Sequence, residues 1–185
     1  MSMPAALDRY YTRDEVLAFP DDGNRYELVH GELLVSPSPR YVHQWAVLRL
    51  ATALDEYVRR YGTGTAMISP ADLSFGRDDL LVQPDVFVIT SPGAETREWD
   101  EVRELSLVVE VLSPSTSRYD RFTKRRLYQE LGVPLYWIID PRERRAEMWT
   151  PGATAPVHEA ERVVWHPTGA VAPLVIDLST LFASS

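Results

Sequence analysis

The sequence has no cysteine and no long apolar run, and both absences exclude classes of protein. Without cysteine among its 185 residues, the chain has no disulfide, no thiolate zinc site and no cysteine nucleophile. No apolar stretch is long enough to span a bilayer. The opening MSMPAALDRYYTRDEV lacks the continuous apolar segment of a signal peptide. We therefore expect a cytoplasmic protein without a membrane segment.

Positive charge is also scarce. The chain carries 19 Lys and Arg against 27 Asp and Glu, a formal net charge of -8, which argues against coating nucleic acid by bulk attraction. The basic residues nevertheless cluster in RYDRFTKRR (118–126) and RERR (142–145). These clusters fit either a local binding surface or a solvated helix face and a hairpin tip, and the sequence leaves both open.

The remaining composition is that of an ordinary globular protein, with 45% hydrophobic and 25% charged residues. A length of 185 residues favours one domain spanning 1–185, with a core of about 25–141 and C-terminal strands over 144–182. In the N-terminal half the sequence predicts a capped helix in 12–19, two strands hinged at Gly31, a helix over 43–61 and a strand in 62–75 broken at Pro70. Strands over 80–89 and 107–112 follow, joined by an irregular link over 91–104. The C-terminal part is predicted to contain a helix over 117–131, strands over 134–140 and 144–150, and a strand-like tail with a short closing helix. This order predicts an α/β fold, a single mixed-sheet domain with flanking helices.

Glu110 stands in the middle of the apolar run LVVEVLSPST (107–116). The run has the length and valine content of a buried strand. On its pleat, Glu110 shares a face with Val108 and Leu112. A lone ionised carboxylate there is costly, so Glu110 requires a compensating partner.

Asp85 repeats this design in LLVQPDVFVI (80–89). If the two strands are neighbours, Asp85 and Glu110 converge at one sheet edge, where they share either a proton or a cation. Oxygen ligands without cysteine favour Mg²⁺ or Mn²⁺ over zinc. The alternative is structural: Glu110 pairs with an arginine and Asp85 caps a turn after Pro84. Taken together with the basic helix that follows, the two acids favour the metal site.

The predicted helix over 117–131 supplies a third group. Asp120, Lys124 and Tyr128 are four residues apart and stack on one face, and Lys124 lies about 10 Å along the axis, within reach of the carboxylates. The packing side is predicted to be Tyr119, Phe122, Leu127 and Leu131. The alternatives are an Asp120–Lys124 surface pair and an N-terminal cap made by Ser117 with Asp120.

These motifs resemble a known family. QPDVFVI, LVVEVLSPST and YDRFTKRRLYQELGVPLYWIIDP look like the Uma-type group of bacterial restriction-endonuclease-like proteins in the PD-(D/E)XK nuclease superfamily. The similarity runs from RYELVHGELLVSPSP to IIDP, and Gly31-Glu32 and His43 also match. Leu112 departs from the superfamily pattern, which has lysine two residues past the glutamate. Lys124 matches the helix lysine that takes this role in the family.

The resemblance implies a restriction-endonuclease-like core and a magnesium-dependent endonuclease that hydrolyses DNA. It implies catalytic roles for Asp85, Glu110 and Lys124, with Mg²⁺ or Mn²⁺ held by Asp85, Glu110 and Glu32. Glu32 is alternatively an ordinary exposed hairpin acid. Candidate substrate contacts are Asp120, Arg121, Tyr128 and His43; of these, Tyr128 is expected rather to pack and His43 to begin a helix.

Further expectations concern partners and turnover. A homodimer follows from the resemblance, since two sites are the simple way to cut two antiparallel strands. The acidic charge and Leu112 support an alternative, a nuclease-derived binding module that binds nucleic acid or protein without turnover. A hydrolase of a smaller phosphate ester is a third reading.

Overall fold

The computed structural model describes residues 9–91 and 97–183 of the chain. Two ranges lie outside the described residues. Residues 1–8 belong to the opening segment in which no signal peptide was expected, and residues 92–96 belong to the predicted irregular link. The elements of the N-terminal half are α1 (Arg13–Leu17), β1 (Asn24–Val29), β2 (Glu32–Pro37), α2 (Tyr41–Tyr61), β3 (Thr65–Ile68), β4 (Leu80–Leu81) and β5 (Val86–Ile89). The remaining elements are η2 (Trp99–Glu101), β6 (Leu105–Val111), η3 (Tyr119–Lys124), α3 (Arg125–Glu130), β7 (Tyr136–Asp140), β8 (Arg145–Trp149), β9 (Val157–Glu159), β10 (Arg162–Trp165), β11 (Leu174–Asp177) and α4 (Leu178–Leu181).

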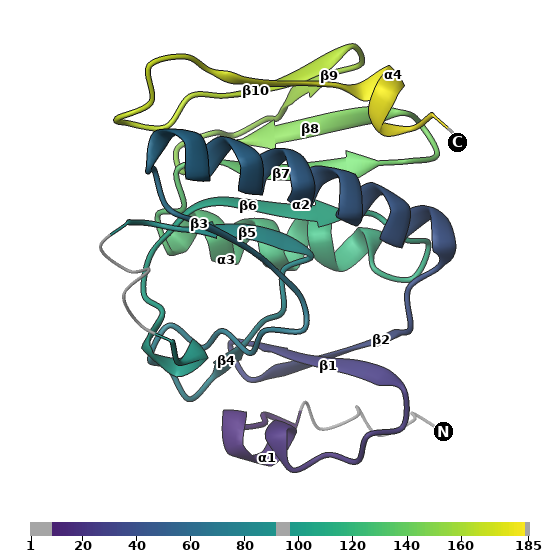
Figure 1. Cartoon of the computed structure of the whole chain (residues 1–185). Coiled ribbons are helices and arrows are strands. Elements are labelled where there is room, and N and C mark those ends of the chain that lie inside the picture. The colour runs from purple at the N-terminus through teal and green to yellow at the C-terminus, as the bar shows by residue number, and fades with distance from the viewer. Residues whose placement is uncertain (1–8, 92–96, 184–185) are drawn as a thin grey trace.

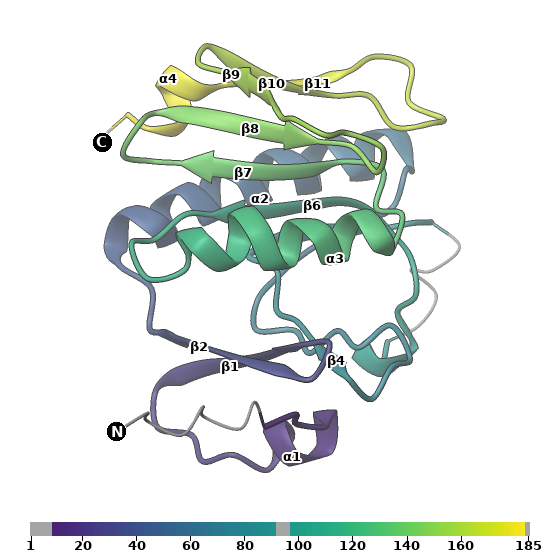
Figure 2. The ribbon, with the colours of Figure 1, turned by 180° about the vertical axis from the view of Figure 1, so that it is seen from behind.

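The main sheet has six strands in the order β3-β5-β6-β7-β8-β9. Its β6–β7 pair is parallel and its other pairs are antiparallel. The segment η3–α3 crosses between β6 and β7, as parallel neighbours require. Helix α2 covers one face of the sheet and α3 the other (Figures 1 and 2). The predicted mixed α/β sheet with flanking helices is confirmed.

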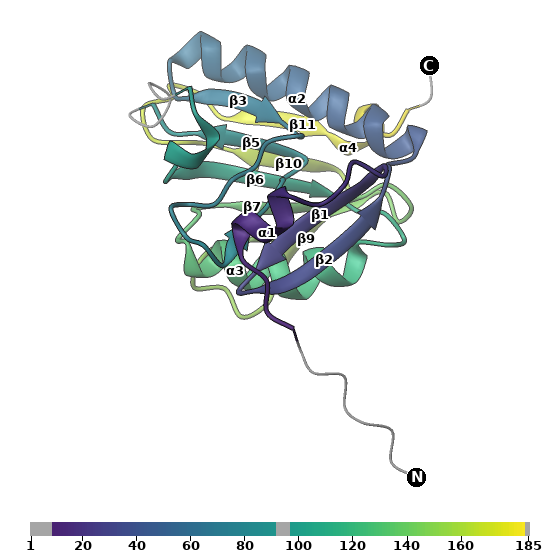
Figure 3. The same cartoon turned by 90° about the horizontal axis from the view of Figure 1, so that it is seen from below.

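A second, three-stranded sheet has the order β2-β1-β4 and lies below the main sheet (Figures 1 and 3). The hairpin β1–β2 turns at His30 and Gly31, whose φ angles of 52° and 79° are those of a two-residue turn matched to strand twist. A side chain at position 31 would also meet the Tyr10 ring, since a Cβ there would lie 2.7 Å from Tyr10 Cδ1. The predicted hinge at Gly31 is therefore confirmed.

Alternation along β6 separates two hydrophobic clusters. Val109 and Val111 pack in the cluster under α2. Val108 and Leu112 pack on the opposite face with Leu127 of α3, so the predicted pleat is confirmed. Glu110 points to this second face, toward η3–α3.

Two element predictions were wrong in detail. The stretch 80–89 is not one strand, because β4 pairs with β1 in the small sheet while β5 lies in the main sheet. Pro84, which has no amide hydrogen, stands in the link, and Asp85 directly precedes β5.

The predicted helix over 117–131 begins as the π-helical segment η3 and continues as α3. Its predicted packing side was also wrong in part. Asp120, Lys124 and Tyr128 are buried against the sheet, and Phe122 is 56% exposed.

Candidate active site

Asp85 and Glu110 meet at one edge of the main sheet. Strands β5 and β6 are antiparallel neighbours, with Val86 opposite Val109, so the residue before β5 lies beside the end of β6. The amide of Asp85 donates to Glu110 Oε2 at 3.4 Å, and the amide of Val111 donates to Asp85 Oδ2 at 2.9 Å. Both side chains are at most 4% exposed.

Lys124 lies among three carboxylates. Its Nζ is 3.0 Å from Glu110 Oε1 and 2.9 Å from Glu27 Oε1, and 3.7 Å from Asp120 Oδ1. The hydroxyl of Tyr128 also donates to Glu110 Oε1, at 3.3 Å. Burial alone would lower the pKa of Lys124, but Glu110, Glu27 and Asp120 raise it well above its usual value. The ammonium is therefore charged in the fold.

The π-helical geometry of η3 and the sheet together bring these groups into place. A π-helical turn is wider than an α-turn and occurs often at functional sites. Here it buries both Asp120 and Lys124, which in a regular surface helix would form an exposed pair. The two alternatives of a surface pair and of a Ser117–Asp120 cap are wrong. Asp120 is 1% exposed, so it forms no surface pair, and Ser117 already lies within the helix, with its amide donating to the Ser113 carbonyl at 3.1 Å, so it is not the N-cap.

Asp85 has cationic partners of its own. Arg25 of β1 donates to Asp85 Oδ1 at 3.1 Å, and His43 Nε2 of α2 lies 3.0 Å from Oδ2. Burial would raise the pKa of Asp85, but the hydrogen bond and charge of His43, followed by the charges of Arg25 and Lys124, hold it well below its usual value. The bond to Asp85 conversely raises the pKa of His43 against its burial.

Acidic side chains nevertheless outnumber permanent cations in the carboxylate cluster, by which we mean Glu27, Asp85, Glu110 and Asp120. Two permanent cations, Arg25 and Lys124, face these four acids, with His43 as a third when protonated. Burial, offset in part by Lys124 and reinforced by the neighbouring acids, raises the pKa of Glu110 well above its usual value. The same causes raise the pKa of Asp120 to about 6. Asp120 Oδ1 is buried and has no hydrogen-bond partner among the residues that the structure describes.

This surplus fits a hard divalent cation. Carboxylate oxygens are the ligands that Mg²⁺ prefers, and Mg²⁺ keeps several waters rather than requiring an all-protein cage. Among the described residues no three His, Asp or Glu side chains are grouped so that they could hold a metal ion, so an ion at this place would have two carboxylate ligands at most, Asp85 and Glu110, and would take its other ligands from water or the backbone. Both oxygens of Asp85 already accept hydrogen bonds, Oδ1 from Arg25 and Oδ2 from His43, so an ion at Asp85 would compete with these partners.

The other predicted site residues are placed differently. Glu32 does not join the carboxylate cluster: it is exposed at the start of β2 and lines a surface groove with Thr123 and Arg126. Arg121 bridges Asp140 at 3.1 Å and Glu147 at 2.7 Å. Tyr128 is buried, as its packing role predicts. His43 lies in the first turn of α2.

The sequence reading missed Arg25 and Glu27. Glu27 is 3% exposed, and its Oε1 also accepts the amide of Gln83 at 2.8 Å. Its sequence signal resembles that of Glu110, since it is a carboxylate among Tyr26, Leu28 and Val29. Arg25 lies two residues earlier, on the same face of β1.

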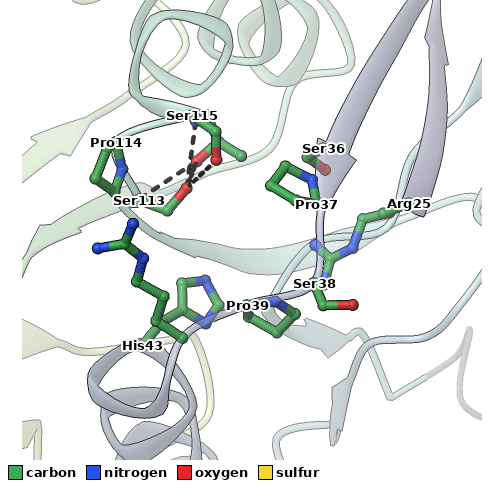
Figure 4. Close-up of a pocket in the computed structure, with 11 residues that line it drawn as sticks. Arg25, Ser36, Pro37, Ser38, Pro39, His43, Ser113, Pro114 and Ser115 are labelled. Carbon is green, nitrogen blue, oxygen red and sulfur yellow. Dashed lines mark hydrogen bonds between the residues drawn. The ribbon is translucent and has the colours of Figure 1, made fainter. Parts of the chain in front are cut away.

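A cavity of about 150 Å³ opens beside the carboxylate cluster, and we call it the mouth cavity. Its walls are the loop Ser113–Ser115 on one side and Arg25 with Ser36–Ser38 on the other (Figure 4). Pro39, Arg40, His43 and Thr116 complete it. Arg25 and His43 line the cavity and also bond Asp85, so they link it to the buried acids.

The fold and this site define a restriction-endonuclease-like α/β protein. A family model described as "Uma2: Putative restriction endonuclease" matches residues 13–176, and the chain belongs to that family. A solved structure, described as a putative nuclease belonging to DUF820 from Anabaena variabilis ATCC 29413, superposes with a TM-score of 0.75 at 23% identity. The alignment covers 92% of this chain and 97% of that one. No curated protein matches the sequence.

Proposed function

We propose that this protein is a magnesium-dependent endonuclease that hydrolyses DNA phosphodiester bonds at Asp85, Glu110 and Lys124. One observation carries the proposal: the two acids converge on adjacent strands with the Lys124 ammonium 3.0 Å from Glu110. Family membership and the nuclease description of the structural relative support it.

Each of the three residues has a defined task in this proposal. Asp85 and Glu110 would hold the ion, and the carbonyl of Val111 is a further candidate ligand. The bound ion supplies charge neutralisation at phosphorus and lowers the pKa of a bound water. Lys124 would orient the attacking water or stabilise charge on the phosphate. Glu32 has no part in it, because its carboxylate is exposed outside the cluster.

The chain's own residues also explain how Lys124 replaces the motif lysine. Leu112 occupies that position and packs in the hydrophobic cluster with Val108 and Leu127. A lysine there would be buried among apolar side chains. Lys124 reaches the same carboxylate from the crossover segment, and its ion pair with Glu27 helps to fix its direction.

The mouth cavity provides the entry for a phosphate. Arg25 and His43 contribute positive charge there, and Ser113, Ser115 and Thr116 contribute hydroxyl groups. When these two cations turn from Asp85 to an incoming phosphate, the carboxylate becomes free for the ion. The proposal thus assigns Arg25 and His43 to substrate binding.

A cleavage assay tests the proposal. Labelled single-stranded and duplex DNA is incubated with the wild type in Mg²⁺ or EDTA, and with Glu110→Gln and Lys124→Met. We expect Mg²⁺-dependent cleavage that falls roughly a hundredfold or more in both variants. Glu56→Gln, an exposed acid on α2, is the control. Activity that survives both substitutions would remove the site.

The second candidate is a binding module without turnover. It is favoured by the ion pairs that already satisfy Asp85 with Arg25 and His43, and Glu110 with Lys124. Metal binding in calorimetry combined with no cleavage of any DNA or RNA tested would support it over the endonuclease.

The remaining expectations belong to this proposal. We expect a cytoplasmic homodimer, by analogy with enzymes that cut both strands of a duplex. Light scattering after size-exclusion chromatography measures the mass against the 21.0 kDa of one chain. Among the described residues, no helix has the length and apolarity needed to cross a membrane.

A further inference from the structure

The outer face of the crossover segment η3–α3 forms a basic and aromatic groove. Arg118, Phe122 and Arg126 are four residues apart and line it together with Tyr119 and Thr123. Glu32 of β2 forms the opposite wall. The groove has a volume of about 710 Å³.

The groove is continuous with the candidate active site. It shares Ser115 with the mouth cavity. At its other end it shares Glu32, Thr123 and Arg126 with a further cavity of about 780 Å³ that Arg9, Tyr10 and Tyr11 line. The hairpin β1–β2 lies on one side of this path and η3–α3 on the other (Figures 2 and 3).

The cations of this path are available to a ligand. Within the described part of the chain, Arg40, Arg118 and Arg126 are exposed and have no ion-pair partner. Their charges contrast with the net charge of -8 of the whole chain. The acids of the path are Glu32 and Glu130, and Glu130 is 2.9 Å from His30 Nε2.

The exposed ring of Phe122 indicates which form of nucleic acid this groove would favour, duplex or unpaired strand. This ring is 56% exposed between two arginines. In a duplex the faces of the bases are covered by their neighbours, whereas an unpaired strand presents them for stacking on aromatic side chains. A groove that combines a line of arginines with aromatic rings is the type that binds single strands.

We propose that this groove binds an unpaired DNA strand and delivers its backbone over Ser115 into the mouth cavity. The inference rests on the proposed function and specifies its substrate as single-stranded or locally unpaired DNA. A single chain would suffice to cut such a substrate, so the homodimer expected above for duplex cleavage is not required for cleavage of an unpaired strand.

Binding measured without cleavage tests this inference. Fluorescence anisotropy is recorded for a labelled DNA single strand, the matching duplex and the equivalent RNA, in Ca²⁺ and again in EDTA, across a salt series. We expect the DNA single strand to bind more tightly than duplex or RNA. The slope of log affinity against log salt is expected near −2, from roughly three phosphate contacts at about −0.7 each.

Two variants separate the ring from the charge. Phe122→Ala is expected to weaken single-strand binding by roughly 5- to 150-fold with an unchanged salt slope. Arg126→Ala is expected to reduce the slope by about 0.7. The controls are Val171→Ala and Arg162→Ala, exposed residues of the C-terminal region.

Equal or tighter binding of duplex, preference for RNA, or unchanged binding in both groove variants would overturn the inference. If cleavage still depends on Glu110 in that case, the proposed function stands without it. Groove-dependent binding of single strands by a wild type that cuts no DNA would instead overturn the proposed function alone.

Discussion

Lys124 Nζ lies 3.0 Å from Glu110 Oε1 and 2.9 Å from Glu27 Oε1, so one buried ammonium joins the crossover segment to the main sheet and to the three-stranded sheet. Lys124 comes from η3, Glu110 from the main sheet and Glu27 from the hairpin β1–β2. The same contact holds the candidate active site and connects three parts of the fold.

Removing this ammonium should destabilise the protein. Lys124→Met leaves Glu110 and Glu27 buried without their cation, and we expect a loss of about 3–5 kcal/mol in the free energy of unfolding. Adding Glu27→Gln removes one uncompensated acid, so the double variant should recover part of this loss. Urea denaturation of both variants and of Glu27→Gln gives the coupling energy. Strictly additive effects would show that Lys124 and Glu27 do not interact.

Asp120 should make stability depend on pH. Its pKa is about 6 in the fold against 3.8 as a model value, so the native state binds the proton more tightly than the unfolded chain. Ionisation of Asp120 therefore weakens the fold as pH rises through this window. Asp120→Asn removes the effect, and we expect it to stabilise the protein by up to about 3 kcal/mol above pH 7 and hardly at all near pH 4.

Thermal unfolding of Asp120→Asn and wild type over pH 4–8 measures this difference. Asp85, His43 and Glu110 titrate in both proteins, and because the charge of Asp120 raises the pKa of Glu110, the difference between the two proteins includes this coupling. A variant that is equally destabilised at every pH would show that Asp120 is needed as a carboxylate in the fold.

Metal binding should release protons. The pKa of Glu110 is raised well above its usual value, so an ion at this carboxylate displaces a bound proton. Apparent Mn²⁺ affinity is therefore expected to increase from pH 5.5 to 8. Calorimetry in two buffers of different ionisation enthalpy measures the release, expected at up to about one proton per ion. An affinity independent of pH would place the ion away from Glu110.

Arg25 should compete with the ion. Its guanidinium bonds Asp85 Oδ1, so Arg25→Met frees an oxygen and removes a repulsive charge. We expect Mn²⁺ affinity to increase on the order of tenfold, while DNA cleavage falls because the phosphate loses a partner. Arg77→Met, which removes a half-buried arginine paired with Asp79, is the control. Weaker metal binding in Arg25→Met would mean that Arg25 supports the site instead.

The strands that position Glu110 and Asp85 could be predicted because the patterns that indicate them lie within short stretches of sequence. An acid within an apolar run marks Glu110, and alternation along β6 assigns its face. Asp85 follows the same pattern, and its convergence with Glu110 requires only that β5 and β6 are neighbours. The prediction that Lys124 lies near these carboxylates came from its position on the next helix and from the family resemblance.

The rest depends on contacts between distant segments. Arg25 lies 60 residues from Asp85 in sequence, and Lys124 meets Glu27 only because the small sheet packs against the crossover segment. Pairing of β4 with β1 likewise has no local signal in residues 80–89. The inward face of 117–131 was misassigned in part because a helical period allows either face when both contain apolar residues. Phe122 is more apolar than Asp120 or Lys124, yet Asp120 and Lys124 lie on the inner face and Phe122 lies on the outer one.

The most direct measurement is a crystal structure with Mn²⁺ and its anomalous signal. If Asp85 and Glu110 hold the ion, we expect one peak bonded to carboxylate oxygens of both residues. Arg25 or His43 should be displaced from Asp85, and Lys124 should still lie beside Glu110. Saturating Mn²⁺ with no peak there, and with Arg25 and His43 both still bonded to Asp85, would contradict this prediction.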